Sequence, residues 1–183
     1  MFARTPRLML RPGWPEDAAA LSQAVAHESV AMNLSRLPWP YAQADAREWL
    51  AIPRSPTDVT LLIVAQDSPT PRLIGAISLD RESGGTPELG YWLTPDAWGR
   101  GYATEAGQAV LHMARHALGL KRLRSRHFVD NPASGRVLGK LGFRETGRGA
   151  TFSRARGREV ASVMLACDLE DARVDDQALS LAA

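Results

Sequence analysis

The segment LGYWLTPDAWGRGYATEA, residues 89–106, joins a short strand to a long helix through a glycine-containing turn. Gly99 and Gly101 flank one arginine in that turn, and glycine lets the backbone approach a ligand closely. The first turn of a helix leaves backbone N–H groups without intrahelical partners, and the helix dipole adds partial positive charge there. A strand, a glycine turn and a helix N-terminus in this order predict a phosphate or pyrophosphate site on residues 99–104.

Two well-known phosphate-binding loops do not fit this segment. The P-loop needs two glycines with four residues between them, followed by Lys and Ser or Thr, and residues 135–140 have the wrong spacing. The dinucleotide-binding fingerprint needs a third glycine, which would fall at Thr104, and an acidic residue on a following parallel strand. The strand after this helix instead ends at Asp130. The segment therefore indicates another type of phosphate loop.

Hydrophobic periodicity and turn residues predict the elements on either side. The expected strands cover residues 5–11, 59–66, 73–79, 88–93, 123–129, 143–148 and 160–169. The expected helices begin at Pro15 and Pro132, cover residues 42–52, and extend from residue 102 to Gly119, with a turn at residues 83–87. This order indicates a mixed α/β sheet with helices on its faces. We expect residues 1–170 to form a single domain and residues 171–183 to form a flexible tail.

The composition is that of a globular protein. The 183 residues are 45% hydrophobic and 23% charged, which argues against a disordered, collagen-like or disulfide-rich chain. The single cysteine, Cys167, cannot form an intrachain disulfide, and no N-terminal apolar stretch suits a signal peptide. The longest apolar run, residues 59–65, is too short to cross a membrane. We therefore expect a cytoplasmic protein with no membrane partner.

The charge is nearly balanced, since 22 basic minus 20 acidic side chains give +2. Among the basic residues only Lys121 and Lys140 are lysines. Arginine suits carboxylates and phosphates, but genomic base composition produces the same bias. Five arginines crowd the final hairpin, where they could steer an acidic substrate or the CoA phosphate, or form a solvated surface, which is the favoured interpretation: Arg144, Arg148, Arg154, Arg156 and Arg158. A nucleic-acid-binding protein usually has a more basic face, so we do not expect a nucleic-acid partner.

Four stretches of sequence resemble the GCN5-related N-acetyltransferase (GNAT) family. Residues 98–103, WGRGYA, resemble its motif A, Gln/Arg-x-x-Gly-x-Gly/Ala, with Trp98 in place of the usual Gln or Arg. Residues 129–143, VDNPASGRVLGKLGF, are similar to its Asn-x-x-Ser, helix and Leu-Gly-Phe segment. Residues 6–12, PRLMLRP, and the Gly-Tyr-Trp strand at residues 90–92 are similar to its RimJ/RimL-type branch. The resemblance covers roughly residues 5–170.

The resemblance implies a GNAT fold, a mixed and mostly antiparallel sheet with splayed middle strands and helices on both faces. It also implies acetyl-CoA as the co-substrate, without a metal. Pantetheine would lie between the strand that contains Tyr91, Trp92 and Leu93 and the strand over residues 123–129. The pyrophosphate would bind the backbone amides of the motif A loop, which comprises Gly99, Arg100, Gly101, Tyr102, Ala103 and Thr104. Asn131 and Ser134 would face the pantetheine and thiol end.

Acetyl transfer from a thioester needs a neutral amine and ends with the release of a thiolate. It also needs an N–H donor that stabilises the oxyanion, and the candidate donor is a strand amide near Leu93. Glu88 is the candidate base that accepts the amine proton, and the alternative interpretation is that Glu88 is only an exposed acid at the end of a strand. Ser134 is the candidate proton donor to the thiolate, and the alternative is that its hydroxyl only caps a helix. The tyrosine acid of many family members would lie at residue 138, which is Leu138 here. A second base position of related enzymes is Arg126, which cannot serve as a base.

Other chemically suggestive residues have plainer interpretations. His112 and His116 have metal-ligand spacing on a helix, but a third ligand is missing, so a solvated helix face is favoured. Cys167 lies in the last strand, away from the motif blocks, which favours direct transfer over an acetyl-cysteine intermediate. Four aromatic residues of the N-terminal part either wall the acceptor site, as in this family, or pack in the core: Trp14, Trp39, Tyr41 and Trp49.

The acceptor amine and the partners stay open at this point. A protein N-terminus, a lysine, an amino acid, a polyamine or an aminoglycoside would each supply an amine, and a homodimer is compatible with the sequence. Two rival functions are a catalytically impaired CoA-binding sensor or scaffold, and an arginine-mediated ribosome- or RNA-binding module.

Overall fold

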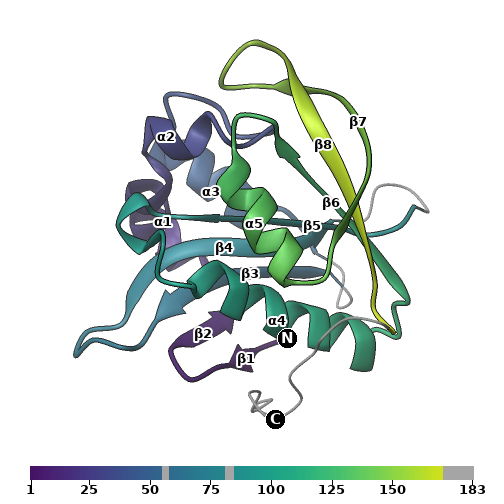
Figure 1. The fold of residues 1–183 in the computed structure, drawn as a ribbon. Coiled ribbons are helices and arrows are strands. Elements are labelled where there is room, and N and C mark those ends of the chain that lie inside the picture. Colours follow the sequence, from purple (N-terminus) through teal and green to yellow (C-terminus); the bar gives the residue numbers. More distant parts are fainter. Residues whose placement is uncertain (55–57, 81–84, 171–183) are drawn as a thin grey trace.

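One twisted sheet organises the chain. The computed structural model describes residues 1–54, 58–80 and 85–170, so the expected tail at residues 171–183 and part of the expected turn at residues 83–87 lie outside the described residues. The strands are β1 (Ala3–Arg4), β2 (Leu8–Arg11), β3 (Val59–Ala65), β4 (Arg72–Asp80), β5 (Glu88–Leu93), β6 (Arg122–Phe128), β7 (Arg144–Ser153) and β8 (Arg158–Asp168). Within the described residues they form one sheet in the order β1-β2-β3-β4-β5-β6-β8-β7 (Figure 1).

Helices cover both faces of this sheet. The helices are α1 (Ala18–Val25), α2 (Glu28–Ala31), α3 (Gln43–Ala51), α4 (Tyr102–His116) and α5 (Pro132–Lys140), with short 3-10 turns η1 (Pro15–Asp17) and η2 (Pro95–Ala97). In Figure 1, α4 and α5 lie in front of the sheet, while α1 and α3 lie behind it. The strand β3 is buried on both faces, because Leu61 and Ile63 face the core with α4 and Leu62 faces the core with α1 and α3. This explains why its sequence is a continuous apolar run.

The two central strands separate along their length. All neighbouring strands pair antiparallel except β5 and β6, which run parallel and share the register Glu88 with Arg124. Two further bonds hold this end together: Arg124 N–H donates to the Pro87 carbonyl at 2.9 Å, and Ser125 Oγ donates to the Leu89 carbonyl at 2.8 Å. Beyond Leu89 the strands diverge and leave a cavity between them. The predicted fold class, with its splayed middle strands, is confirmed.

Some predicted element bounds were wrong. The strand expected over residues 5–11 begins only at Leu8 as β2, because Thr5 closes a tight turn between β1 and β2 through bonds with the backbone of Leu8. The helix expected to extend to Gly119 ends at His116. The helix α2 was not predicted, since four residues are too few to show a helical period. The final hairpin is longer than predicted, since most of β7 is exposed and lacks apolar alternation.

Candidate active site

A cavity of about 820 Å³ passes through the gap between β5 and β6. We call residues 99–104, the motif A loop named above, the glycine loop. On the side of α4 and α5 the cavity is lined by residues of the glycine loop and of the start of α5: Gly99, Gly101, Tyr102, Ala103, Thr104, Asn131 and Ser134. On the side of the N-terminal helices it is lined by apolar and aromatic residues, among them Leu21, Val25, Tyr41, Trp49 and Trp92. One cavity therefore joins the glycine loop to a chamber lined by Tyr41, Trp49 and Trp92 through an opening in the sheet.

The glycine loop presents free backbone donors to this cavity. Gly99 has φ of 73° and Gly101 has φ of 83°, a backbone conformation that residues other than glycine rarely adopt. Gly101 is the N-cap of α4 and supplies no side-chain cap, so the amides of the first helical turn are left without an intrahelical partner. Helix dipole and amides together favour an anion here.

Trp98 fixes the loop to the strand that precedes it. Its indole Nε1 donates to the Leu93 carbonyl at 2.9 Å, while the residue as a whole is 47% exposed. Leu93 itself is buried and lines the cavity at the end of β5. The tryptophan at the first motif position therefore holds the loop against β5 by a side-chain bond to the backbone.

The side chains of the loop do not all face the cavity. Tyr102 is buried, and its hydroxyl donates to Asp67 in the turn between β3 and β4. The Arg100 guanidinium lies 3.7 Å from the Asp67 carboxylate and 5.0 Å from the Tyr102 ring centre, and Arg100 is absent from the described residues that line the cavity. These two residues would contribute backbone groups, rather than side chains, to a bound phosphate.

Tyr91, Asn131 and Ser134 come together at the start of α5. The Tyr91 hydroxyl lies 2.8 Å from Ser134 Oγ and also donates to the Ser134 carbonyl at 3.2 Å. The Ser134 N–H donates to Asn131 Oδ1 at 3.2 Å, which makes Asn131 the N-cap of α5. The interpretation of the Ser134 hydroxyl as a helix cap is therefore wrong, because Asn131 has that role.

Burial controls the ionisation of the tyrosines in the cavity wall. Burial raises the pKa of Tyr91 to about 12, and the hydrogen bond with Ser134 acts in the opposite direction. Burial, with a smaller contribution from the charge of Asp45, raises the pKa of Tyr41 to about 12. Both phenols are therefore neutral hydrogen-bonding groups near pH 7.

Glu88 lies in the cavity wall between two arginines. Its carboxylate accepts from Arg126 Nε at 2.7 Å and from Arg126 Nη2 at 2.8 Å, and Arg124 Nε lies 3.3 Å away. The Glu88 side chain is only 14% exposed, so the interpretation as an exposed strand-end acid is wrong. Arg126 occupies the second base position named above, and the fork of its guanidinium fixes the carboxylate of Glu88.

The aromatic residues divide between the two expected roles. Tyr41 and Trp49 line the cavity and also pack against the apolar cluster under α1 and α3. Trp14 stacks with Arg11 at 4.2 Å and is 46% exposed, and Trp39 is 36% exposed. Tyr41 and Trp49 alone therefore combine both predicted roles.

The paired histidines of α4 lie outside the cavity, and the described residues contain neither a metal-ligand cluster nor a membrane-spanning helix. The rings of His112 and His116 stack with centroids 4.4 Å apart on α4, outside the cavity wall. Across residues 1–54, 58–80 and 85–170, no three His, Cys, Asp or Glu side chains gather as a metal site. The helices described there include none with the length and apolar character needed to span a membrane.

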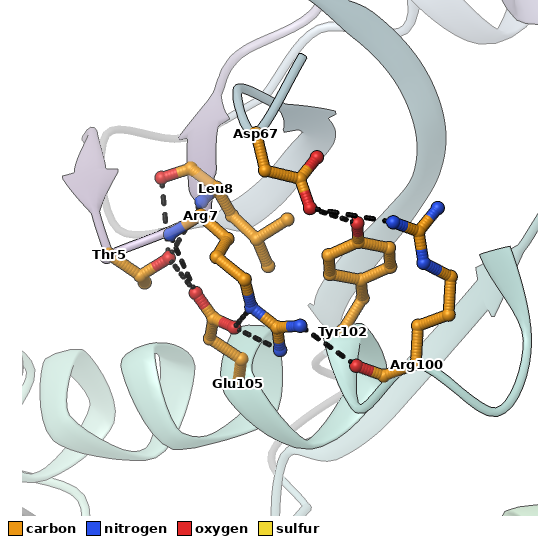
Figure 2. A network of polar contacts seen from close by, with 7 residues as sticks. All are labelled: Thr5, Arg7, Leu8, Asp67, Arg100, Tyr102 and Glu105. Atoms are coloured by element: carbon orange, nitrogen blue, oxygen red, sulfur yellow. Dashed lines mark hydrogen bonds and ion pairs between the residues drawn. The ribbon is translucent and has the colours of Figure 1, made fainter.

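Sequence reasoning missed a group of contacts behind the glycine loop, which Figure 2 shows. Glu105 of α4 binds Thr5 and Arg7 of the N-terminal hairpin, and Arg7 also donates to the Arg100 carbonyl. Residues about 100 positions apart form these contacts, so no local pattern could have predicted them.

Known proteins resemble the chain in sequence and fold. Residues 7–144 match the acetyltransferase (GNAT) domain family. The chain is 28% identical over 162 residues to the uncharacterized N-acetyltransferase p20 of Bacillus licheniformis, covering 84% of this chain and 88% of that protein. It is 38% identical over 73 residues to the ribosomal-protein-serine acetyltransferase of Escherichia coli, covering 39% of this chain and 41% of that enzyme. A GNAT-family acetyltransferase from Bacillus anthracis has the same fold, with a TM-score of 0.80, 22% identity, and coverage of 93% of this chain and 100% of that one.

Proposed function

The chain belongs to the GNAT acetyltransferase family, and on this premise we propose that it moves an acetyl group from acetyl-CoA directly to a primary amine. The observation that carries the proposal is the single cavity that connects the glycine loop to the aromatic chamber through the separated strands. This geometry suits a two-substrate transfer, because the thioester and the amine can meet at the gap from opposite sides of the sheet.

The loop side of the cavity suits the cofactor. In this proposal the amides of Gly99, Arg100, Gly101, Tyr102, Ala103 and Thr104 bind the pyrophosphate. Pantetheine then lies in the gap between β5 and β6, beside Tyr91, Trp92 and Leu93, and its amide meets Asn131. The positive φ of both glycines and the uncapped N-terminus of α4 support this placement.

The aromatic side of the cavity suits the acceptor. We propose a primary amine, either a protein N-terminus or a small molecule, in the chamber walled by Tyr41, Trp49 and Trp92. The likeness to a ribosomal-protein-serine acetyltransferase supports a protein N-terminus as the first acceptor to test. An α-amino group near pKa 8 loses its proton more readily than a lysine near 10.4, which makes it the easier nucleophile.

The chemistry is assigned to residues at the gap. Glu88 receives the amine proton through water, because Arg126 already occupies two of its acceptor positions. An amide of β5 near Leu93, where pairing with β6 has ended, stabilises the oxyanion. Ser134 donates a hydrogen bond to the departing thiolate. The nitrogen–carbon bond forms as the carbon–sulfur bond breaks, giving an amide and CoA.

The fold also supports residues 1–170 as one catalytic domain. The hydrophobic core between the sheet and α4 contains residues of both the N-terminal hairpin and β8. The two ends of this range therefore belong to one core.

An amine panel read by release of free thiol tests the proposal. The panel contains peptides with free N-termini, the same peptides with blocked N-termini and an internal lysine, a polyamine and an aminoglycoside. We expect release of free thiol only with one class of amine, and we expect mass spectrometry to identify the acetylated form of that amine. Tight CoA binding without transfer to any amine would favour the sensor function, and salt-sensitive RNA binding without CoA would favour the ribosome-binding module.

A further inference from the structure

Glu105 ties the N-terminal hairpin to the first turn of α4 (Figure 2). Its carboxylate accepts from Thr5 Oγ1 at 2.6 Å, from the Arg7 backbone N–H at 3.0 Å and from Arg7 Nε at 2.7 Å. The Glu105 side chain is 15% exposed and the Arg7 side chain is 39% exposed, so the carboxylate is shielded from water while the guanidinium is partly exposed. Such charge-assisted bonds fix the Arg7 guanidinium over the start of the helix.

Arg7 then acts on the glycine loop itself. Its Nη1 donates to the Arg100 carbonyl at 2.9 Å, and its guanidinium lies 4.6 Å from the Tyr102 ring centre. The Arg100–Gly101 peptide is planar and trans, so its carbonyl and its N–H point in opposite directions. Because Arg7 holds the carbonyl on the hairpin side, the Gly101 N–H is directed away from the hairpin. Gly101 is also one of the residues that line the cavity.

A second tie holds the loop from the β3–β4 turn. The Tyr102 hydroxyl donates to Asp67, and Arg100 lies 3.7 Å from the same carboxylate. Arg7 and Asp67 are both absent from the described residues that line the cavity. Their contacts reach the loop from behind, on the side opposite to a bound ligand.

We propose that Arg7 and Glu105 are positioning residues, which set the direction of the Gly101 N–H before the cofactor arrives. This inference rests on the proposed binding of the CoA pyrophosphate at the loop. A loop whose donors already point at the ligand loses less conformational freedom on binding, so affinity for the pyrophosphate depends on the contacts behind it. Arg7 contributes through the Arg100 carbonyl and does not contact the cofactor.

The test compares two acetyl donors that differ in the pyrophosphate. Acetyl-CoA carries it and acetyl-pantetheine does not. Arg7→Met keeps an unbranched apolar side chain and removes the donors, and we expect a loss of CoA affinity of roughly tenfold by calorimetry. The KM for acetyl-CoA should rise by the same factor while kcat stays near the wild-type value. The kcat/KM for acetyl-pantetheine should be unchanged, and Arg7→Lys should restore part of the affinity.

Arg148→Met is the matched control, because Arg148 pairs with Glu145 at 2.9 Å on the exposed hairpin far from the loop. If Arg7→Met fails to fold, Glu105→Gln keeps the shape of the side chain and weakens the same bonds, so it carries the test. Unchanged CoA affinity in a folded variant overturns the inference, and so does an equal loss with both donors. Failure of the wild-type protein to bind CoA would overturn the proposed function, and the inference with it.

Discussion

The hydroxyl of Tyr91 lies 2.8 Å from the hydroxyl of Ser134, across the space between β5 and the first turn of α5. Tyr91 also donates to the Ser134 carbonyl, so the phenol is directed at this serine. Burial keeps the pKa of Tyr91 at about 12, which leaves the phenol neutral at pH 7. Either hydroxyl can be the donor in the contact with Ser134 Oγ. When the phenol proton is directed at Ser134 Oγ, the serine proton points away from Tyr91 and is available to the thiolate.

The first prediction is that Ser134→Ala and Tyr91→Phe lower turnover to a similar and modest extent. The loss should stay well below the roughly 10²-fold typical of a general acid, because a thiolate leaves without protonation. The double variant should be no slower than either single variant, since both act on one proton. Steady-state kinetics with saturating acetyl-CoA measure this. Full turnover in Ser134→Ala would remove the serine from the reaction.

The second prediction concerns alkaline stability. The folded-state pKa of Tyr91 is raised above the usual 10 by burial, so the folded state holds this proton more tightly than the unfolded state. The resulting stability is fully present below pH 10 and is lost as the pH rises toward 12. Tyr91→Phe should therefore flatten the fall of the melting temperature over this range. Part of the fall should remain, because Tyr41 has a similarly raised pKa. An unchanged slope would contradict the prediction.

The sequence allowed prediction of the elements around the glycine loop more accurately than the contacts among side chains. The strand over residues 88–93 matches β5, because turn residues bound it on both sides. The pairing of Glu88 with Arg126 joins residues 38 positions apart. It depends on the parallel register of β5 and β6, which no local pattern contains. The contact of Tyr91 with Ser134 depends in the same way on where α5 packs.

The third prediction is that Gly101→Val reduces CoA affinity strongly while the fold stays intact. A valine strains the backbone at φ of 83°, and its Cβ would lie 3.4 Å from Arg7 Nη2. Gly119→Val is the control, because Gly119 has φ of 61° just beyond the C-terminal end of α4 and is not among the described residues that line the cavity. Calorimetry should show the loss only at Gly101, while circular dichroism stays native for both. Equal affinity in the two variants would refute the loop assignment.

The fourth prediction is that Glu88→Gln lowers turnover by roughly 10² near neutral pH, the low end for a general base. The deficit should shrink as the pH approaches the pKa of the acceptor amine, because the amine then arrives without its proton. The KM for acetyl-CoA should hardly change. Glu145→Gln, which alters an exposed Glu–Arg pair on the final hairpin, is the control and should keep wild-type turnover.

Glu88→Gln also replaces a carboxylate that pairs with Arg126 and Arg124. The effect of losing these ion pairs on turnover therefore has to be separated from the effect of losing the general base. A structural loss would persist at high pH, where the amine is already neutral. Recovery with pH therefore identifies the proton-transfer role, and a pH-independent deficit would assign Glu88 to holding the two arginines.

The last prediction separates the two roles of Asn131. Its Oδ1 caps α5 through the Ser134 N–H, and its amide is proposed to bond pantetheine. Asn131→Ala should remove both, with a loss of about 1 kcal/mol in the free energy of unfolding and a rise in the KM for acetyl-CoA of a similar free energy. Asn131→Ser keeps a capping oxygen without the amide, so it should melt like the wild type yet still show the raised KM. Because pantetheine is bound in both the ground and transition states, kcat should change little in either variant. A serine variant with wild-type KM would leave Asn131 as a cap alone.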